Sequence, residues 1–285
     1  MIEFKPEHEF FVGIDSDGCT FDTMELKHKE CFIPQFINHY ELQGVSKYAR
    51  EAAEFVNLYS KSRGCNRFNA LVEQLEWLRQ RPEVLNRGVQ VPKLVSVEKW
   101  LTEETKLGNP ALKQACESSG DAELKQALDW SEDVNATVKR IVRGVPPFPY
   151  VRECLDKLAA RCDMLCVSAT PNEALEAEWA EHGLRKYVRA ICGQEIGTKK
   201  ETLALSKPFD PSNRLMIGDA PGDFKAAMAN GCQFFPINPG DEEASWQALY
   251  EEGIERFFNG SFAGDYQNQL LADFDARLPE RPHWK

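Results

Sequence analysis

The sequence has no excess of positive charge. Its 285 residues carry 34 lysines and arginines against 45 aspartates and glutamates, and the formal net charge is −11 at pH 7. Proteins that bind nucleic acids or anionic membrane surfaces need a basic footprint to displace counterions or attract lipid headgroups. We therefore exclude nucleic acid and membrane as main partners. An anionic ligand would require positive charge concentrated at one site, against the overall field.

Long apolar runs are also missing. No segment approaches the roughly 18 consecutive apolar residues of a membrane span. Residues 1–9 are rich in charge and lack the apolar core of a secretion signal. The 18 glycines and 16 prolines are close to average usage, and no repeat or low-complexity segment is present. These absences predict an ordinary globular protein of the cytoplasm.

Paired cysteine spacing is absent as well. The nearest two of the nine cysteines, Cys162 and Cys166, are separated by three residues, and no Cys-x-x-Cys occurs. An odd number without paired spacing argues against a disulfide framework or a zinc site. Reduced thiols in a cytosol are the better interpretation.

What the sequence does contain is a set of short apolar runs that each stop at a polar residue. They fit buried parallel strands that are covered on both faces. The three clearest runs are residues 10–14, 164–167 and 215–218, and weaker candidates are 188–192 and 232–237.

Helical patterns alternate with these strands from about residue 145 onward, which predicts a parallel sheet with helices on its faces. Residues 23–145 break the alternation, because they have helix-like periodicity and no convincing strand. We therefore predict an α/β fold: a Rossmann-like parallel sheet core formed by residues 1–22 and 146–285, with an α-helical domain inserted at 23–145.

Carboxylates follow two of the predicted strands. Asp15 and Asp17 come after the first, and Asp219 and Asp223 come after the run at 215–218. Ligand sites in open α/β sheets form outside the carboxyl ends of the strands. Four carboxylates at one edge would repel one another unless a hard cation lay among them, and such oxygen ligands suit Mg²⁺.

These residues resemble the motifs of the haloacid dehalogenase superfamily, a group of aspartyl-phosphate hydrolases. The first motif, Asp-x-Asp-Gly-x-x-x-Asp-Ser/Thr, is matched by residues 15–23. Ser168, at the end of a strand, matches the second motif. Gly218-Asp219 with Asp223 matches the fourth, Gly-Asp-x-x-x-Asp. The resemblance covers about residues 8–24 and 146–237, and it implies that the inserted domain is a helical cap.

The resemblance also implies roles for these residues. Asp15 would attack phosphorus and form an aspartyl-phosphate. Asp17 would serve as general acid and then as base. Mg²⁺ would be held by the Asp15 carboxylate, the backbone carbonyl of Asp17 and Asp219, with Asp223 as a direct or indirect ligand. The phosphoryl group would be bound by Ser168 and by the neighbouring positions Gly18 and Ala169.

The third motif of the family is a lysine that opens a helix. The family's lysine usually precedes a leucine by four positions, which selects Lys199 before Leu203. Lys200 is a close alternative, and Lys207 a distant one. This lysine would neutralise the carboxylates and the transferred phosphoryl group.

The inserted domain implies a small phosphorylated metabolite as substrate. Within it, Arg63, Asn66 and Arg67 lie between two helical patterns and are candidate substrate-binding residues. Arginine can hold an anionic group through two parallel hydrogen bonds. An ordinary helix connection with solvated arginines is an equally weighted interpretation.

The leading hypothesis is a Mg²⁺-dependent phosphatase. Asp17 favours phosphate esters, since relatives that cleave carbon–halogen or phosphorus–carbon bonds lack this second aspartate. One alternative is a phosphomutase acting on a sugar phosphate, but related mutases have a histidine where this chain has Lys27. The other alternative is a ligand-binding protein with little turnover. The sequence carries no signal for oligomeric state.

Overall fold

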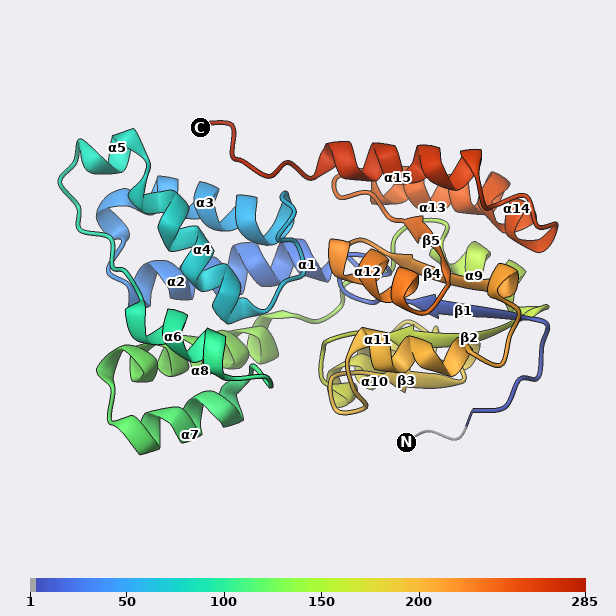
Figure 1. Ribbon diagram of the computed structural model, residues 1–285, viewed down its shortest axis with the longest axis horizontal. Coiled ribbons are helices and arrows are strands. Elements are labelled where there is room, and N and C mark those ends of the chain that lie inside the picture. Colours follow the sequence, from blue (N-terminus) through green and yellow to red (C-terminus); the bar gives the residue numbers. More distant parts are fainter. Residues whose placement is uncertain (1–3) are drawn as a thin grey trace. The chain divides into compact units, whose positions relative to one another are not determined.

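The computed structural model describes residues 4–285 (Figure 1). Its chain divides into two compact units, which are described one at a time. The core unit extends to Met24 and resumes over Arg143–Leu278. The helical unit comprises Glu25–Val142 and Pro279–Lys285.

A five-stranded parallel sheet forms the centre of the core unit. Its strand order is β3-β2-β1-β4-β5, so the first strand in the chain is the middle strand of the sheet. In register, Gly13 pairs with Leu165 on one side and with Met216 on the other. The strands are β1 (Phe10–Ile14), β2 (Cys162–Val167), β3 (Ala190–Cys192), β4 (Arg214–Gly218) and β5 (Gln233–Pro236).

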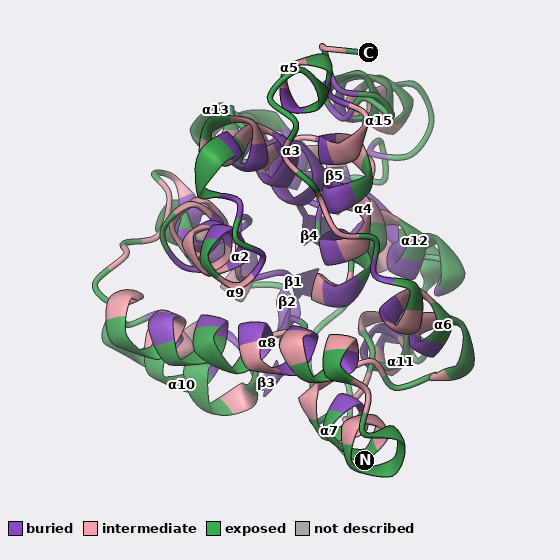
Figure 2. Ribbon diagram, turned by 90° about the vertical axis from the view of Figure 1, so that its left-hand side faces the viewer, coloured by how far each residue is buried: buried purple, intermediate pink, exposed green. Residues whose placement is uncertain are grey.

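Helices cover both faces of this sheet, because its strands are apolar on both sides. Phe10, Val12 and Ile14 point into one hydrophobic cluster, and Phe11 points into another. The first cluster is completed by α9 (Val151–Ala159), α10 (Asn172–Glu181), α13 (Glu242–Ala248) and α14 (Ile254–Phe258). The second is completed by α11 (Lys199–Leu203), α12 (Pro221–Ala229) and α15 (Asp265–Arg277). Figure 2 shows the strands as buried between these layers.

The predicted α/β fold with a parallel sheet is confirmed. The first predicted strand has the observed bounds, and the two weaker candidates contain β3 and β5. β2 begins two residues before the predicted start, at Cys162. Asp163 concealed that start, because a charged residue inside an apolar run looks like a strand boundary, whereas here it is fully buried.

The helical unit contains no strand between Glu25 and Val142. α1 (Thr23–Leu26) continues through a π-helical turn, Lys27–Phe32, into α2 (Ile33–His39). α8 (Ala122–Ile141) buries one stripe of side chains at helical spacing, visible as purple bands in Figure 2. The remaining helices are α3 (Ser46–Leu58), α4 (Arg67–Arg79), α5 (Pro82–Leu85), α6 (Val95–Glu103) and α7 (Asn109–Ser119). Among the described residues, no helix is both long and apolar enough to cross a membrane.

The last residues of the chain, 279–285, belong to the helical unit and not to the core with which they were expected to group. The Trp284 ring lies 5.9 Å from that of Phe55, and the Arg81 guanidinium lies 4.2 Å from the Trp284 ring centroid. The Pro279 carbonyl accepts a hydrogen bond from the Lys61 amide, at 3.3 Å. The chain therefore passes between the two units at three points: after Met24, after Val142 and after Leu278.

Candidate active site

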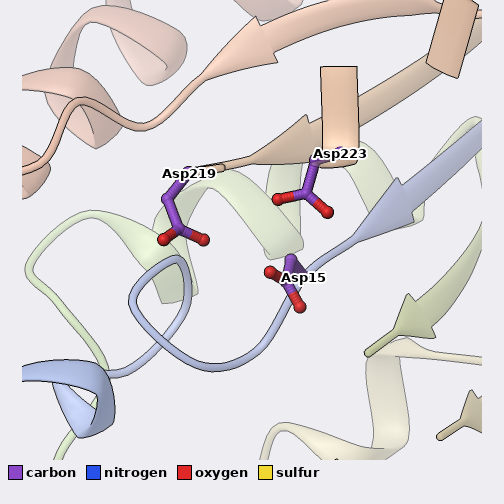
Figure 3. A group of neighbouring side chains, drawn as sticks. All are labelled: Asp15, Asp219 and Asp223. Carbon is purple, nitrogen blue, oxygen red and sulfur yellow. The ribbon is translucent and has the colours of Figure 1, made fainter. Parts of the chain in front are cut away.

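Three aspartates meet at the carboxyl ends of β1 and β4. Asp15 follows β1, Asp219 follows β4, and Asp223 lies in the first turn of α12. All three side chains are buried, and one oxygen from each lies within 4.8 Å of the others. Figure 3 shows the three carboxylates pointing toward one another. The predicted convergence of carboxylates is present for these three residues.

Gly218 makes this approach possible. A Cβ atom at this position would lie 2.5 Å from the Cβ of Asp223, closer than side chains pack. The Asp223 carboxylate also accepts a hydrogen bond from the Ala220 amide, at 3.1 Å, which fixes it against the turn between β4 and α12. The Gly-Asp-x-x-x-Asp pattern is thus explained by packing as well as by charge.

Lys199 contacts two of the three carboxylates. Its Nζ lies 2.7 Å from Oδ2 of Asp15 and 2.6 Å from Oδ1 of Asp223. The lysine opens α11, whose start is fixed by a capping box between Thr198 and Glu201. The alternative, Lys200, is exposed. The geometry therefore associates Lys199, rather than Lys200, with the carboxylates.

The cluster contains more negatively ionisable groups than positive ones, and this shifts the pKa values of its members. Burial raises the pKa of Asp15 well above its ordinary value, Lys199 opposes this, and Asp223 and Asp219 add to it. Burial works against the charged form of Lys199, but Asp15 and Asp223 outweigh it and hold the pKa of Lys199 above its ordinary value. Three buried carboxylates face one lysine, and a divalent cation would relieve the remaining repulsion.

Asp17 lies beside this cluster but is not one of its three side chains. Its Oδ2 accepts a hydrogen bond from the Thr170 hydroxyl at 2.6 Å, and its Oδ1 accepts one from the Thr23 hydroxyl. The backbone turns away directly afterwards at Gly18, whose φ of 76° favours glycine. Asp17 was predicted to bind the metal through its backbone carbonyl. The side-chain contacts described here do not involve that carbonyl, so this role stays a prediction.

Ser168 follows β2 and is buried, and its amide donates to the Cys192 carbonyl at 3.0 Å. Its Oγ accepts a hydrogen bond from the Thr170 amide at 3.3 Å. Ala169, between them, is exposed. Sequence reasoning selected Ser168 and Ala169 but missed Thr170. A threonine two residues after a strand is too common to be a signal by itself.

The residues selected in the helical unit have structural contacts of their own. Asn66 caps α4, where its Oδ1 accepts from the Phe68 amide at 3.0 Å. Arg63 is buried and donates to the Leu58 carbonyl at 2.9 Å. Both residues therefore have a structural role within the helical unit.

Arg67 differs from these two residues. Its Nη1 bonds to the side chains of Ser131 and Asn135, at 3.0 and 2.7 Å, and its guanidinium lies 5.0 Å from the Phe32 ring centroid. Burial lowers the pKa of Arg67 to about 10. Within residues 4–285 it forms no ion pair, which leaves this cation without a carboxylate partner.

Comparison with known proteins agrees with this arrangement. A family model described as haloacid dehalogenase-like hydrolase matches residues 91–237, just over half of the chain. The matched range includes Ser168, Lys199, Asp219 and Asp223, while Asp15 and Asp17 precede it. No curated protein matches the chain.

Solved structures share the fold at low sequence identity. A proposed phosphoglycolate phosphatase from Lactobacillus delbrueckii subsp. bulgaricus is 14% identical, with a TM-score of 0.53 over 87% of this chain and 98% of that one. A haloacid dehalogenase-like hydrolase from Streptococcus pneumoniae is 14% identical, with a TM-score of 0.44 over 93% and 98%. A proposed beta-phosphoglucomutase from Thermotoga maritima is also 14% identical, with a TM-score of 0.42 over 85% and 99%. At such identities the likeness concerns the fold.

Proposed function

The chain belongs to the haloacid dehalogenase-like hydrolases, and on that premise we propose that it is a Mg²⁺-dependent phosphatase of a small phosphorylated metabolite. The observation that carries this proposal is the buried cluster of Asp15, Asp219 and Asp223 with Lys199. The cluster combines a carboxylate nucleophile, oxygen ligands for a cation and a positive charge at one end of a rigid sheet.

The first step is phosphoryl transfer to Asp15. A carboxylate oxygen of Asp15 forms a bond to phosphorus while the bond from phosphorus to the ester oxygen breaks. Asp17 gives its proton to that ester oxygen, and a neutral alcohol leaves. The Asp15 backbone is held for this step by its amide, which donates to the Ile217 carbonyl at 3.0 Å, and by the Thr20 hydroxyl, which donates to the Asp15 carbonyl at 2.7 Å.

The second step is hydrolysis of the aspartyl-phosphate. Water attacks phosphorus and gives its proton to Asp17, which is now a carboxylate and can act as base. The bond between phosphorus and Asp15 breaks, and inorganic phosphate is released. Both residues return to their starting states, so the cycle consumes one ester and one water.

The donor set fits Mg²⁺. Asp15, Asp219 and Asp223 supply carboxylate oxygens, the ligands that this cation prefers, and no sulfur or imidazole ligand belongs to the group. We propose the three carboxylates and the Asp17 carbonyl as its ligands. When bound, Mg²⁺ would neutralise charge on the phosphoryl oxygens and allow an anionic ester to approach Asp15.

Ser168, Gly18 and Ala169 are proposed to bind the phosphoryl oxygens, and Lys199 is proposed to balance their charge. Ser168 and Gly18 follow adjacent strands, β2 and β1, and the Gly18 amide already donates to the Phe21 carbonyl, at 2.8 Å. Ser168 and Ala169 are therefore the stronger candidates for direct donation to a ligand.

The helical unit is proposed to act as a cap that selects the substrate, through Arg63, Asn66 and Arg67. Arg67 is the best of these candidates, because it is desolvated and has no carboxylate partner among the described residues. A partly buried cation of this kind favours an anionic group as ligand. We also propose a cytoplasmic location, which agrees with nine cysteines that form no disulfide within residues 4–285.

A screen of phosphate esters tests the proposal. We expect wild-type protein to release phosphate from at least one ester with Mg²⁺ and to stop in EDTA. Asp15→Asn should lose about 10³-fold or more of this activity, because an amide is a poor nucleophile. Equal release by the variant would contradict the proposal. Transfer of phosphate to a sugar in place of water would identify a phosphomutase.

A further inference from the structure

The general acid of the proposed reaction is held by two hydroxyls. Thr170 Oγ1 lies 2.6 Å from Oδ2 of Asp17, and the Thr23 hydroxyl donates to Oδ1. We infer that Thr170 is a positioning residue that sets the orientation of the Asp17 carboxyl for proton transfer. This inference rests on the proposed function, in which Asp17 protonates the leaving oxygen.

Thr170 is itself firmly seated. Its amide donates to Oγ of Ser168 at 3.3 Å, and its carbonyl accepts from the Gln194 amide at 3.1 Å. Gly193 lies so close that a Cβ atom there would be 2.3 Å from the Thr170 carbonyl oxygen. The loops after β2 and β3 therefore pack directly against each other at Thr170. A side chain on a backbone that is anchored in this way can fix the rotamer of a neighbour.

A hydroxyl suits this task because it can donate and accept. It donates to Asp17 as a carboxylate and, after rotation, accepts from Asp17 as a carboxylic acid. Asp17 exists in both forms during one cycle, since it gives a proton to the ester oxygen and then takes one from water. A backbone N–H or an ammonium group can only donate, so it could not accept a hydrogen bond from the protonated form of Asp17.

The inference predicts that Thr170 matters most when the leaving group is poor. An alkyl alcohol needs a proton as its bond to phosphorus breaks, whereas p-nitrophenolate leaves without one. The ratio of kcat/KM for an alkyl phosphate to that for p-nitrophenyl phosphate therefore reports how well the acid is placed. This ratio excludes the later hydrolysis step, because kcat/KM ends at the first irreversible step.

The experiment compares Thr170→Val, Thr170→Ser and the wild type with ethyl phosphate and p-nitrophenyl phosphate in Mg²⁺. We expect Thr170→Val to lose about 30-fold in kcat/KM for ethyl phosphate, a part of what general acid catalysis supplies. The loss for p-nitrophenyl phosphate should stay within about threefold, since acid catalysis contributes little there. Thr170→Ser, which keeps the hydroxyl, should restore most of the ethyl phosphate activity.

Thr202→Val is the matched control, since Thr202 is a buried threonine of α11 and the substitution is the same. It should leave the ratio of kcat/KM for ethyl phosphate to that for p-nitrophenyl phosphate unchanged, and circular dichroism should show that all variants fold. Equal losses for both esters in Thr170→Val, or no loss for either, would overturn the inference and leave the phosphatase proposal intact. No phosphate release by the wild type from these two esters or from any other ester of the screen would overturn both.

Discussion

Buried aspartates lie at both ends of the parallel strands, but their charges are compensated to different degrees. We call the side of the sheet where the strands begin its amino-terminal edge and the side where they end its carboxyl edge. At the amino-terminal edge, Asp163 of β2 is fully buried and accepts hydrogen bonds from the amides of Glu7 and His8, at 2.7 and 3.1 Å. It also pairs with the Arg189 guanidinium at 2.9 Å. At the carboxyl edge, Asp15 shares a single lysine with Asp223, and Asp219 lies within the same group.

The pKa shifts follow this difference. Burial alone would raise the pKa of Asp163, but hydrogen bonds from Glu7, His8 and Arg189 bring it below its ordinary value. Burial raises the pKa of Asp15. Lys199 lowers it, but the neighbouring carboxylates of Asp223 and Asp219 raise it further, and the pKa stays above its ordinary value. A buried charge whose partners are all present is costly to break, while a buried charge that lacks such partners indicates a site completed by a ligand.

The largest expected effect concerns the single lysine at the carboxyl edge. Lys199→Met should reduce kcat/KM by about 100-fold or more, because it removes a preorganised charge beside the nucleophile. Lys200→Met is the matched control and should retain activity, since Lys200 is exposed. Phosphate release under identical Mg²⁺ conditions measures both. A comparable loss in Lys200→Met would reverse the assignment of the two lysines.

The same substitution at the two edges should change stability in opposite directions. Asp163→Asn should lower the free energy of unfolding by about 2–3 kcal/mol, because a charge-assisted network loses its acceptor. Asp15→Asn should raise it by about 1 kcal/mol in metal-free protein, because repulsion is relieved. Urea unfolding with EDTA measures both values. Destabilisation of equal size at both edges would break the comparison.

The pH dependence of metal-free stability should separate the edges again. Because the folded pKa of Asp15 is raised, stability should fall as pH rises through that pKa, and Mg²⁺ should restore it. Because the folded pKa of Asp163 is lowered, its contribution is present above the ordinary value of 3.8 and is lost below it. Thermal melts of wild type and Asp15→Asn across pH 4–8, at about one-unit steps, would show the first effect as a difference between the two proteins.

The smallest expected effect concerns His8, one of the hydrogen-bond donors to Asp163 at the amino-terminal edge. His8→Ala should cost about 0.5–1 kcal/mol, because it removes only the ring hydrogen bond to Asp163, while the His8 amide still donates. The loss should be detectable in urea unfolding and absent from kcat/KM. A loss as large as that of Asp163→Asn would mean that the ring, and not the amides, holds this carboxylate.

The sequence predicted the core well because its signals are local. Each strand is a short apolar run, and the polar residues that follow β1, β2 and β4 reach one edge as a consequence of parallel topology. Asp15, Asp219 and Asp223 could be grouped on this basis alone. Lys199 could be chosen over Lys200 only through spacing to Leu203, and its contacts agree with that choice.

The contacts that the sequence did not predict join segments that are far apart along the chain. Thr170 and Thr23 lie more than a hundred residues apart, yet both bond to Asp17. Nothing local distinguishes such hydroxyls from ordinary surface ones. Asn66 was selected for its chemistry, but its clearest function is to cap α4, a role that depends on where the helix begins.

The C-terminal residues have a practical consequence for anyone who recombines this protein. An exchange of residues 25–142 for the insert of a relative would remove Phe55 and Arg81 and leave Trp284 without the surfaces on which it packs. In a working chimera, residues 279–285 and the insert have to come from the same parent protein. By the same logic, a fluorophore at Lys285 reports on the helical unit, although residues 279–285 come after the last helix of the core, which ends at Arg277.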